Sequence, residues 1–343
     1  MKALVYTGTN SSELRDVEAP VAAGGQSIVD LSFCGICGSD MHAWHGHDER
    51  RIPPLVLGHE AVGTALTGPL AGRRVAVNPL MTCNDCPACD SGNHHLCGTR
   101  ELIGMRYPGA FAEQVMVPDA NLTVLADHLS FSEAALAEPA AVAVRAVEIA
   151  AGTGATADSR IVILGGGAIG VLVAQVLAAK GFARPRIAET NPLRRGMLDN
   201  IGIAGSYDPR EETPEDGSVD LVIDCVGMGA TRVAASAMAR PGGVIVHVGL
   251  QDNEPGLDTR RLTLQEIGFF GAYCYRHQDF ATALDLLTGG KVTGEGWTEI
   301  RPLDDGKQAF IDIDQGRAPP KIILATGLRR DWTMRLAMPI CRA

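Results

Sequence analysis

The sequence lacks an excess of positive charge. Its 30 lysines and arginines face 40 aspartates and glutamates, which gives a formal net charge of −10 at pH 7. Nucleic acids and anionic membrane surfaces are bound by basic surfaces, so this balance argues against both as partners. We expect no nucleic acid and no membrane partner, and a small molecule as the substrate.

The sequence also lacks a secretory signal and an uninterrupted hydrophobic run of membrane length. The N-terminal MKALVYTGTN has neither the long apolar region nor the small-residue cleavage site of such a signal, so we expect a cytoplasmic protein. Residues 161–179 carry no charge, but four glycines interrupt them, and a buried strand, turn and helix explain them better than a membrane span. The 343 residues, 46% of them hydrophobic, suit two domains or one large α/β enzyme.

Four of the nine cysteines lie within fifteen positions, in the segment NPLMTCNDCPACDSGNHHLCG. They are Cys83, Cys86, Cys89 and Cys97. Thiolates spaced closely in tight turns direct their sulfurs at one point, as tetrahedral zinc prefers. The residues between them form turns and supply little apolar material, so a metal would provide the missing core. We predict a closed structural zinc site; an iron–sulfur cluster and four unrelated thiols are the alternatives.

A second group of candidate ligands stands upstream of these cysteines. The segments FCGICGSDMHAWHGH and PLVLGHEAVG contain Cys37, His59 and Glu60. Zinc accepts one thiolate, one imidazole and one carboxylate when it keeps a fourth position open. A single histidine is more often a surface or hydrogen-bonded residue than a ligand, so this prediction depends on the rest of the chain.

The second half of the chain has the pattern of a dinucleotide-binding fold. RIVILGGGAIGVLVAQVLAAKG is a β-branched run, a glycine turn and an apolar stretch of helical length. Gly165, Gly167 and Gly170 match GxGxxG, and we expect them and Ile169 to contact a cofactor whose phosphates lie at the helix N-terminus. The later runs SVDLVIDCVG and GGVIVHVGL predict a doubly wound parallel sheet. The alternative is that the glycines only pack helix against strand.

The residues after this turn bear on the choice of cofactor. RIAET is the expected second strand, and Glu189 stands 19 residues beyond Gly170. A carboxylate at this place binds the ribose hydroxyls and repels a 2′-phosphate, so we predict NAD rather than NADP. Arg194 is predicted as a further cofactor contact, and its charge keeps NADP open as the alternative.

In combination, these motifs resemble the zinc-containing medium-chain alcohol dehydrogenase family. The resemblance rests on GICGSDMH, GHEAVG, the four-cysteine loop, AEPAAVAV and GGGAIG, and it runs from about residue 1 to residue 328. It is strongest to the polyol, sugar-acid and threonine dehydrogenases, because Glu60 follows His59 and because Glu138 and Pro139 open the segment before the cofactor domain.

The resemblance implies an α/β architecture of two domains. A GroES-like β-rich catalytic domain would comprise residues 1–141 and 278–328, with a structural-zinc lobe at about residues 78–98. A Rossmann NAD-binding domain with a doubly wound parallel sheet would comprise residues 142–277. Residues 329–343 extend beyond the family pattern and have no assigned role.

The resemblance also implies a role for each matching residue. The residues that match the ligands of the family's catalytic zinc are Cys37, His59, Glu60 and, directly or through a water, Glu138. Ser39 would take the proton of the alcohol, and His42 would pass it toward solvent. The four loop cysteines match the family's structural zinc, so we expect two zinc ions per chain.

The implied activity is the reversible, NAD-linked oxidation of a secondary hydroxyl of a small polyol or sugar acid, by a homodimer or homotetramer. Cys274 stands where the family often has an arginine that helps to bind a polyol, which argues against sorbitol itself. The alternatives are an L-threonine 3-dehydrogenase or another secondary-alcohol or diol dehydrogenase. More remote are a zinc ribbon that binds nucleic acid and a structural, crystallin-like role.

Overall fold

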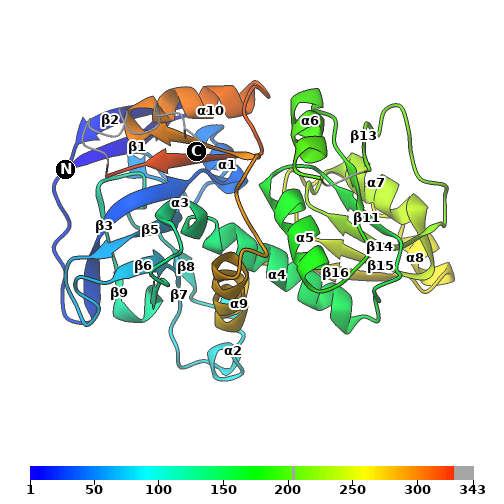
Figure 1. Ribbon diagram of the computed structural model, residues 1–343, viewed down its shortest axis with the longest axis horizontal. Helices are drawn as coiled ribbons and strands as arrows, with labels where there is room; N and C mark the ends of the chain where they lie inside the picture. Colours follow the sequence, from blue (N-terminus) through cyan, green and yellow to red (C-terminus); the bar gives the residue numbers. More distant parts are fainter. Residues whose placement is uncertain (203–204, 328–343) are drawn as a thin grey trace, which may run out of the picture.

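The computed structural model describes residues 1–202 and 205–327, which form two halves side by side (Figure 1). One half is built mainly on antiparallel strands and includes both the N-terminal segment and the last described strand. The other half is a parallel sheet with helices on its faces. Residues 329–343, the predicted extension, lie outside the described residues.

The β-rich half is organised around strand β3 (Gln26–Gly35), which pairs with β5, β9 and β18. The larger sheet runs β10-β6-β5-β3-β18-β17, with β9 beside β3, and a smaller sheet runs β2-β1-β4. The other strands of this half are β1 (Lys2–Gly8), β2 (Ser11–Asp16), β4 (Leu55–Val56), β5 (Glu60–Ala65), β6 (Arg74–Val77), β7 (Leu80–Met81), β8 (Glu101–Leu102), β9 (Gln114–Pro118), β10 (Leu122–Val124), β17 (Thr298–Pro302) and β18 (Lys321–Ala325). Its short helices are α1 (Gly38–Trp44), α2 (Pro87–Asp90), η1 (His94–Leu96), η2 (Asp119–Asn121), α3 (Phe131–Ala134), η3 (Leu303–Asp305) and α10 (Gly306–Asp314).

The parallel sheet has the strand order β13-β12-β11-β14-β15-β16. The order reverses at β11 because the chain moves outward to β13 and then returns to start β14 on the other side, as in a doubly wound sheet. The strands are β11 (Ile161–Leu164), β12 (Arg186–Ala188), β13 (Ser206–Tyr207), β14 (Val219–Asp224), β15 (Ala239–His247) and β16 (Gly268–Gly271). The accompanying helices are α5 (Ala168–Ala179), α6 (Pro192–Asn200), α7 (Gly229–Met238) and α8 (Thr259–Leu264).

The central strands of this sheet are hydrophobic on both faces because helices cover both. Along β11, Ile161 and Ile163 belong to the core that includes α5, whereas Val162 and Leu164 belong to a separate core with residues of α7. Successive side chains of a strand point to opposite faces, so a continuous apolar run fills both cores.

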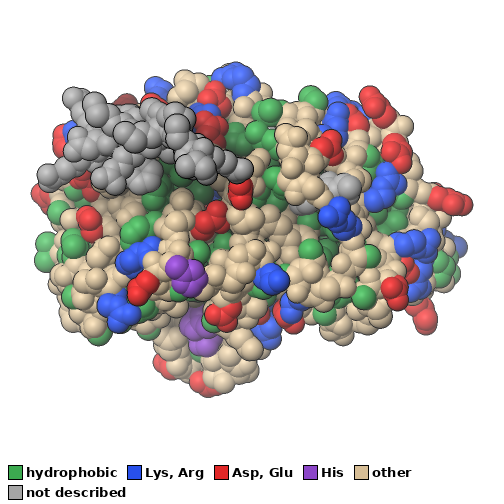
Figure 2. Space-filling model, viewed as in Figure 1, with side chains coloured by type: hydrophobic (Ala, Val, Ile, Leu, Met, Phe, Trp, Pro, Cys, Tyr) green, Lys and Arg blue, Asp and Glu red, His purple; other side chains and the backbone are tan. Residues whose placement is uncertain are grey.

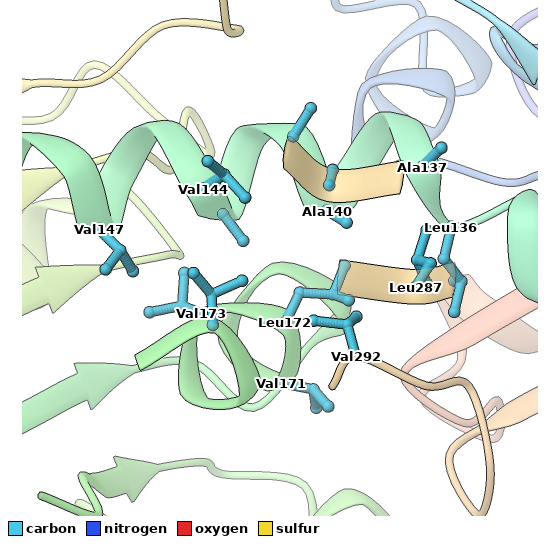
Figure 3. Packing of buried hydrophobic residues seen from close by; sticks show 14 of the residues in the cluster. Leu136, Ala137, Ala140, Val144, Val147, Val171, Leu172, Val173, Leu287 and Val292 are labelled. Carbon is cyan, nitrogen blue, oxygen red and sulfur yellow. The ribbon is translucent and has the colours of Figure 1, made fainter. Parts of the chain in front are cut away.

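Two helices join the halves. α4 (Ala137–Gly152) and α9 (His277–Thr288) pack on each other, and Figure 3 shows Val144 and Ala140 of α4 above Leu172 of α5. The same hydrophobic core continues into the β-rich half, where it includes Phe33 and Ile323. The two sheets are therefore connected by packed side chains as well as by the chain itself.

The predicted fold class, a GroES-like β-rich part with a Rossmann doubly wound parallel sheet, is confirmed. Among the described residues no helix is long and apolar enough to cross a membrane. On the face in Figure 2, basic and acidic side chains are interspersed and form no continuous basic patch among the described residues.

Candidate functional site

The four loop cysteines converge on one point of a lobe that projects from the β-rich half. Cys83 lies 3.4 Å from Cys97 and 3.9 Å from Cys89, and Cys86 lies 3.6 Å from Cys89, all measured between sulfurs. A disulfide would need about 2.05 Å. A tetrahedron with metal–sulfur bonds of about 2.3 Å has edges of about 3.8 Å, so these spacings fit a zinc ion bound by four thiolates.

The lobe lies against the second half of the chain. The His94 ring stacks on His277, the first residue of α9, with 3.9 Å between ring centroids. Arg100 lies over the Tyr273 ring, with its guanidinium carbon 4.8 Å from the centroid. A metal-stabilised lobe would therefore also support the segment around Tyr273 and His277, which follows the last strand of the parallel sheet.

The second ligand group forms where β3 ends and β5 begins. Gly35 and Glu60 are paired across these strands, so Cys37, two residues later, lies beside Glu60. A side chain at Gly35 would place its Cβ 1.9 Å from a Glu60 carboxylate oxygen, so a larger residue there would force the carboxylate to move. The ligand atoms of Cys37, His59 and Glu60 lie within 4.8 Å of one another, and His59 and Glu60 are buried. This set suits a zinc ion with an open position.

A buried lysine that the sequence analysis missed lies against this group. Lys321, at the start of β18, places its ammonium nitrogen 2.6 and 2.5 Å from the two carboxylate oxygens of Glu60 and 2.9 Å from the Ile36 carbonyl. Burial alone would lower the pKa of Lys321, but the charges of Glu60 and Cys37 raise it. The lysine therefore stays charged and balances the buried carboxylate.

Asp40 is the second residue that the sequence analysis missed. Its carboxylate is fully buried, accepts a hydrogen bond of 3.0 Å from the Cys37 backbone N–H, and lies 3.5 Å from His59 Nδ1. A carboxylate facing one ring nitrogen fixes the orientation of the imidazole and directs the other nitrogen toward a metal. Asp40 thus positions both Cys37 and His59.

Glu138 lies near the start of α4 and is 7% exposed. It does not belong to the group of three ligands that lie within 4.8 Å of one another. Burial raises the pKa of Glu138 to about 7, an effect that His59 opposes and Glu60 reinforces.

Cys274 adopts a left-handed backbone conformation with φ of 45°. Burial and the charge of Glu138 together raise the pKa of the Cys274 thiol to about 12.

The predicted proton-transfer residues lie on α1, directly after Cys37. Ser39 is half-buried and accepts a hydrogen bond of 3.3 Å from Arg51 at its hydroxyl oxygen. His42 lies one turn further along the helix. Burial lowers the pKa of His42, and the neighbouring His47, His45 and Arg51 lower it further.

One cavity of about 710 Å³ connects the second metal group with the glycine turn. Its lining includes Cys37 and Glu60 from the β-rich half. From the parallel half it includes every residue predicted to contact the cofactor, namely Gly165, Gly167, Ile169, Gly170, Glu189 and Arg194. Because the cavity reaches both groups, a molecule bound at the turn would extend toward the metal ligands.

The glycines of the turn are sterically required. Gly165 has φ of +99°, and a Cβ at Gly170 would lie 1.9 Å from the Gly165 carbonyl oxygen. Glu189 accepts hydrogen bonds from the backbone N–H groups of Gly166 at 2.9 Å and Asn191 at 2.8 Å. Each carboxylate oxygen keeps a lone pair for a ribose hydroxyl.

Arg194 and Arg195, the two arginines near the Glu189 carboxylate, differ in their surroundings. Arg195 donates to the Glu189 carbonyl at 2.8 Å and lies 3.1 Å from Asp208. Arg194 extends over the turn, with a terminal nitrogen 3.9 Å from the Cβ position of Gly167, and its Nε has no hydrogen-bond partner among the described residues. Arg194 is therefore the guanidinium of this pair that is available to an anion in the cavity.

Sequence comparisons agree with this geometry. Residues 23–127 match the family model for the alcohol dehydrogenase GroES-like domain, and residues 168–289 match that for zinc-binding dehydrogenases. The chain is 31% identical to 2-dehydro-3-deoxy-L-galactonate 5-dehydrogenase of Pseudoalteromonas atlantica, over 92% of this chain and 95% of that protein. The chain belongs to the zinc-containing medium-chain alcohol dehydrogenases.

Two further relatives of this dehydrogenase family extend the comparison. L-galactonate-5-dehydrogenase of Escherichia coli is 31% identical over 81% of this chain and 84% of its own. The structure of an alcohol dehydrogenase from Thermus sp. ATN1 superposes with a TM-score of 0.85 at 26% identity, covering 95% of this chain and all of the other. The predicted family is confirmed, and the protein is a zinc-dependent dehydrogenase that acts on CH–OH donors, of the polyol and sugar-acid type.

We expect Cys89→Ser to remove one zinc ion per chain and to lower the melting temperature, because the loop has little core without its metal. Metal analysis and thermal unfolding of the same preparation measure both effects. Cys225→Ser, a substitution of a half-buried thiol outside the lobe, is the control and should keep the full zinc content. An unchanged zinc content together with an unchanged melting temperature in Cys89→Ser would contradict the structural role.

Proposed function

We propose that the protein oxidises a secondary hydroxyl of a small polyol or sugar acid to a ketone, reversibly, with NAD as the hydride acceptor. The observation that carries this proposal is the single cavity shared by Cys37, Glu60 and the glycine turn. Hydride transfer needs the reacting carbon and the nicotinamide ring to be held together, and a cavity with metal ligands at one end and a dinucleotide turn at the other is suited to that task.

In the proposed catalytic site, Cys37, His59 and Glu60 would hold the catalytic zinc, and Glu138 would complete the ligand set directly or through water. Zinc, when bound, lowers the pKa of a coordinated hydroxyl and polarises a carbonyl. The Ser39 hydroxyl oxygen accepts the substrate proton and at the same time gives up the proton of its own hydroxyl. His42 then passes that proton toward solvent, and the lowered pKa of its imidazole keeps the ring neutral and able to accept it.

The electrons leave the substrate as a hydride. NAD, when bound, would accept the hydride of the substrate carbon and become NADH, while Ser39 takes the proton of the substrate hydroxyl, so that the alcohol becomes a ketone. Gly165, Gly167, Ile169 and Gly170 orient the cofactor in this proposal. The four loop cysteines hold the structural zinc and take no part in the chemistry, because four thiolates leave no open position.

The substrate class and the assembly are also proposals. The two galactonate dehydrogenases among the relatives support a sugar acid, and Cys274 argues against sorbitol.

We propose residues 1–141 and 278–328 as the catalytic domain and residues 142–277 as the cofactor domain. We further propose a homodimer or homotetramer, which light scattering would test; the edge strand β16, where Phe270 is 39% exposed, is a candidate contact.

The proposal is tested by NAD reduction with the zinc-loaded protein across polyols, sugar acids, vicinal diols and L-threonine. We expect turnover of a polyol or sugar acid and little with sorbitol. A preference for threonine would identify a threonine 3-dehydrogenase instead. Absence of turnover with every compound, in a sample shown to contain two zinc ions per chain, would contradict the proposed function.

We expect Cys37→Ser to abolish turnover and to remove one zinc ion while the protein stays folded. An open catalytic site contributes less to folding than a closed structural one, so the loss of stability should be smaller than in Cys89→Ser. Circular dichroism, metal content and activity measured together distinguish the two variants. Full activity in Cys37→Ser would refute the assignment of this metal site.

We expect the wild type to use NAD better than NADP by kcat/KM, and Glu189→Gln to reduce that preference by about tenfold or more. Glutamine keeps one of the two oxygens that accept from the Gly166 and Asn191 backbone N–H groups and removes the charge that repels a 2′-phosphate. Glu211→Gln, an exposed change in the same half, is the matched control. An unchanged ratio in Glu189→Gln would show that this carboxylate does not select the cofactor.

A further inference from the structure

Arg51 is a buried cation beside the proposed proton path. Its side chain is 1% exposed, although the neighbouring His47, Glu49 and Arg50 are exposed. Its guanidinium donates to the Gly104 carbonyl at 2.9 Å, to the Ser39 carbonyl at 3.1 Å, to Asp48 at 2.7 Å and to the Ser39 hydroxyl at 3.3 Å. Neither the sequence motifs nor the family match singles out this residue.

We propose that Arg51 is a positioning residue that orients the Ser39 hydroxyl for proton transfer. This inference rests on the proposed function, in which Ser39 takes the proton of the substrate. The geometry that supports it is the double contact with one residue, because two nitrogens of a rigid guanidinium hold both the main-chain and the side-chain oxygen of Ser39.

The hydrogen-bonding capacity of the two groups explains how the orientation arises. A guanidinium has donors only, whereas a serine hydroxyl has one hydrogen and two lone pairs. Ser39 must therefore accept from Arg51, which occupies one lone pair. The other lone pair is left for the substrate proton, and the hydroxyl hydrogen is left to pass onward. Without Arg51, the hydroxyl could rotate and donate to a nearby carbonyl, which would remove it from the proton path.

The charges around Arg51 hold it in this position. Asp48 is 9% exposed and binds both Arg51 and Arg50, and the Arg50 contacts measure 2.9 and 3.0 Å. Other titratable groups near Arg51 include Asp40, His42, His45 and His47, and His45 lies 2.8 Å from Asp314. Because Arg50 also pairs with Asp48, removal of Arg51 does not leave this buried carboxylate without a cation.

The test compares Arg51→Met with Arg50→Met, which removes a guanidinium from the same carboxylate but makes no contact with Ser39. With the best substrate and saturating NAD, we expect Arg51→Met to lower kcat by about tenfold or more, a part of the 10²–10⁴ that a positioned proton acceptor provides. The KM for NAD should change by less than about twofold, the solvent deuterium isotope effect on kcat should rise, and Arg51→Lys should recover part of the loss. Arg50→Met should retain the wild-type kcat.

A double-mutant cycle with Ser39→Ala separates positioning from a general structural effect. If Arg51 acts through Ser39, Arg51→Met should lower kcat by less than about threefold in the Ser39→Ala background. Equal losses in both backgrounds, equal losses in Arg51→Met and Arg50→Met, or a loss of kcat without a change in the isotope effect would overturn the inference. If the turnover of Ser39→Ala is too slow to measure, the kcat values and isotope effects of Arg51→Met and Arg50→Met alone test the inference. Absence of turnover in the wild type would contradict the proposed function itself.

Discussion

The buried ion pair between Lys321 and Glu60 ties the C-terminal part of the chain to the metal site. The two residues are 261 positions apart, and both side chains are at most 2% exposed. A buried carboxylate without a partner is strongly destabilising, so Glu60 can occupy this place only if β18 returns to pair with β3. The parallel half is thereby inserted in the sequence between two parts of one sheet, and the buried surroundings of Glu60 are complete only when both parts are present.

Charge balance explains why so many ionisable groups are buried near this pair. Asp40, Glu60 and Glu138 are all at most 7% exposed, and the buried cations Arg51 and Lys321 interact with Asp40 and with Glu60, respectively. A divalent zinc ion would carry the charge opposite to that of the Cys37 thiolate and the Glu60 carboxylate. The observed arrangement therefore suits a metal whose ligands are already oriented, with Asp40 directing His59 and Lys321 holding Glu60.

The local motifs could be predicted from sequence, and the long-range contacts could not. The cysteine loop and the glycine turn carry their ligands within short segments, so spacing alone predicted that the thiols of Cys83 and Cys97 would lie together and that Gly165 and Gly170 would be sterically required. Lys321, Asp40 and Arg51 are different. Each acts through a residue on another element, and a lone lysine in PPKIILA or an arginine in HDERRIPP is indistinguishable from a solvated charge until the fold brings it to its partner. The hydrogen bond from the Gly166 N–H to Glu189, which joins two separate segments, was missed for the same reason.

The packed joint formed by α4 and α9 constrains how the two halves can move. Dense hydrophobic cores deform little, so the halves would rotate about this joint, as about a hinge, rather than separate. Glu138 lies in the first turn of α4, one of the two helices of this joint, whereas Pro319 and Pro209 line the cavity from opposite halves. A small rotation would therefore widen or narrow the mouth of the cavity while the distances among Cys37, His59 and Glu60 stay nearly constant. Cofactor exchange and the geometry of the metal ligands would thus be mechanically independent.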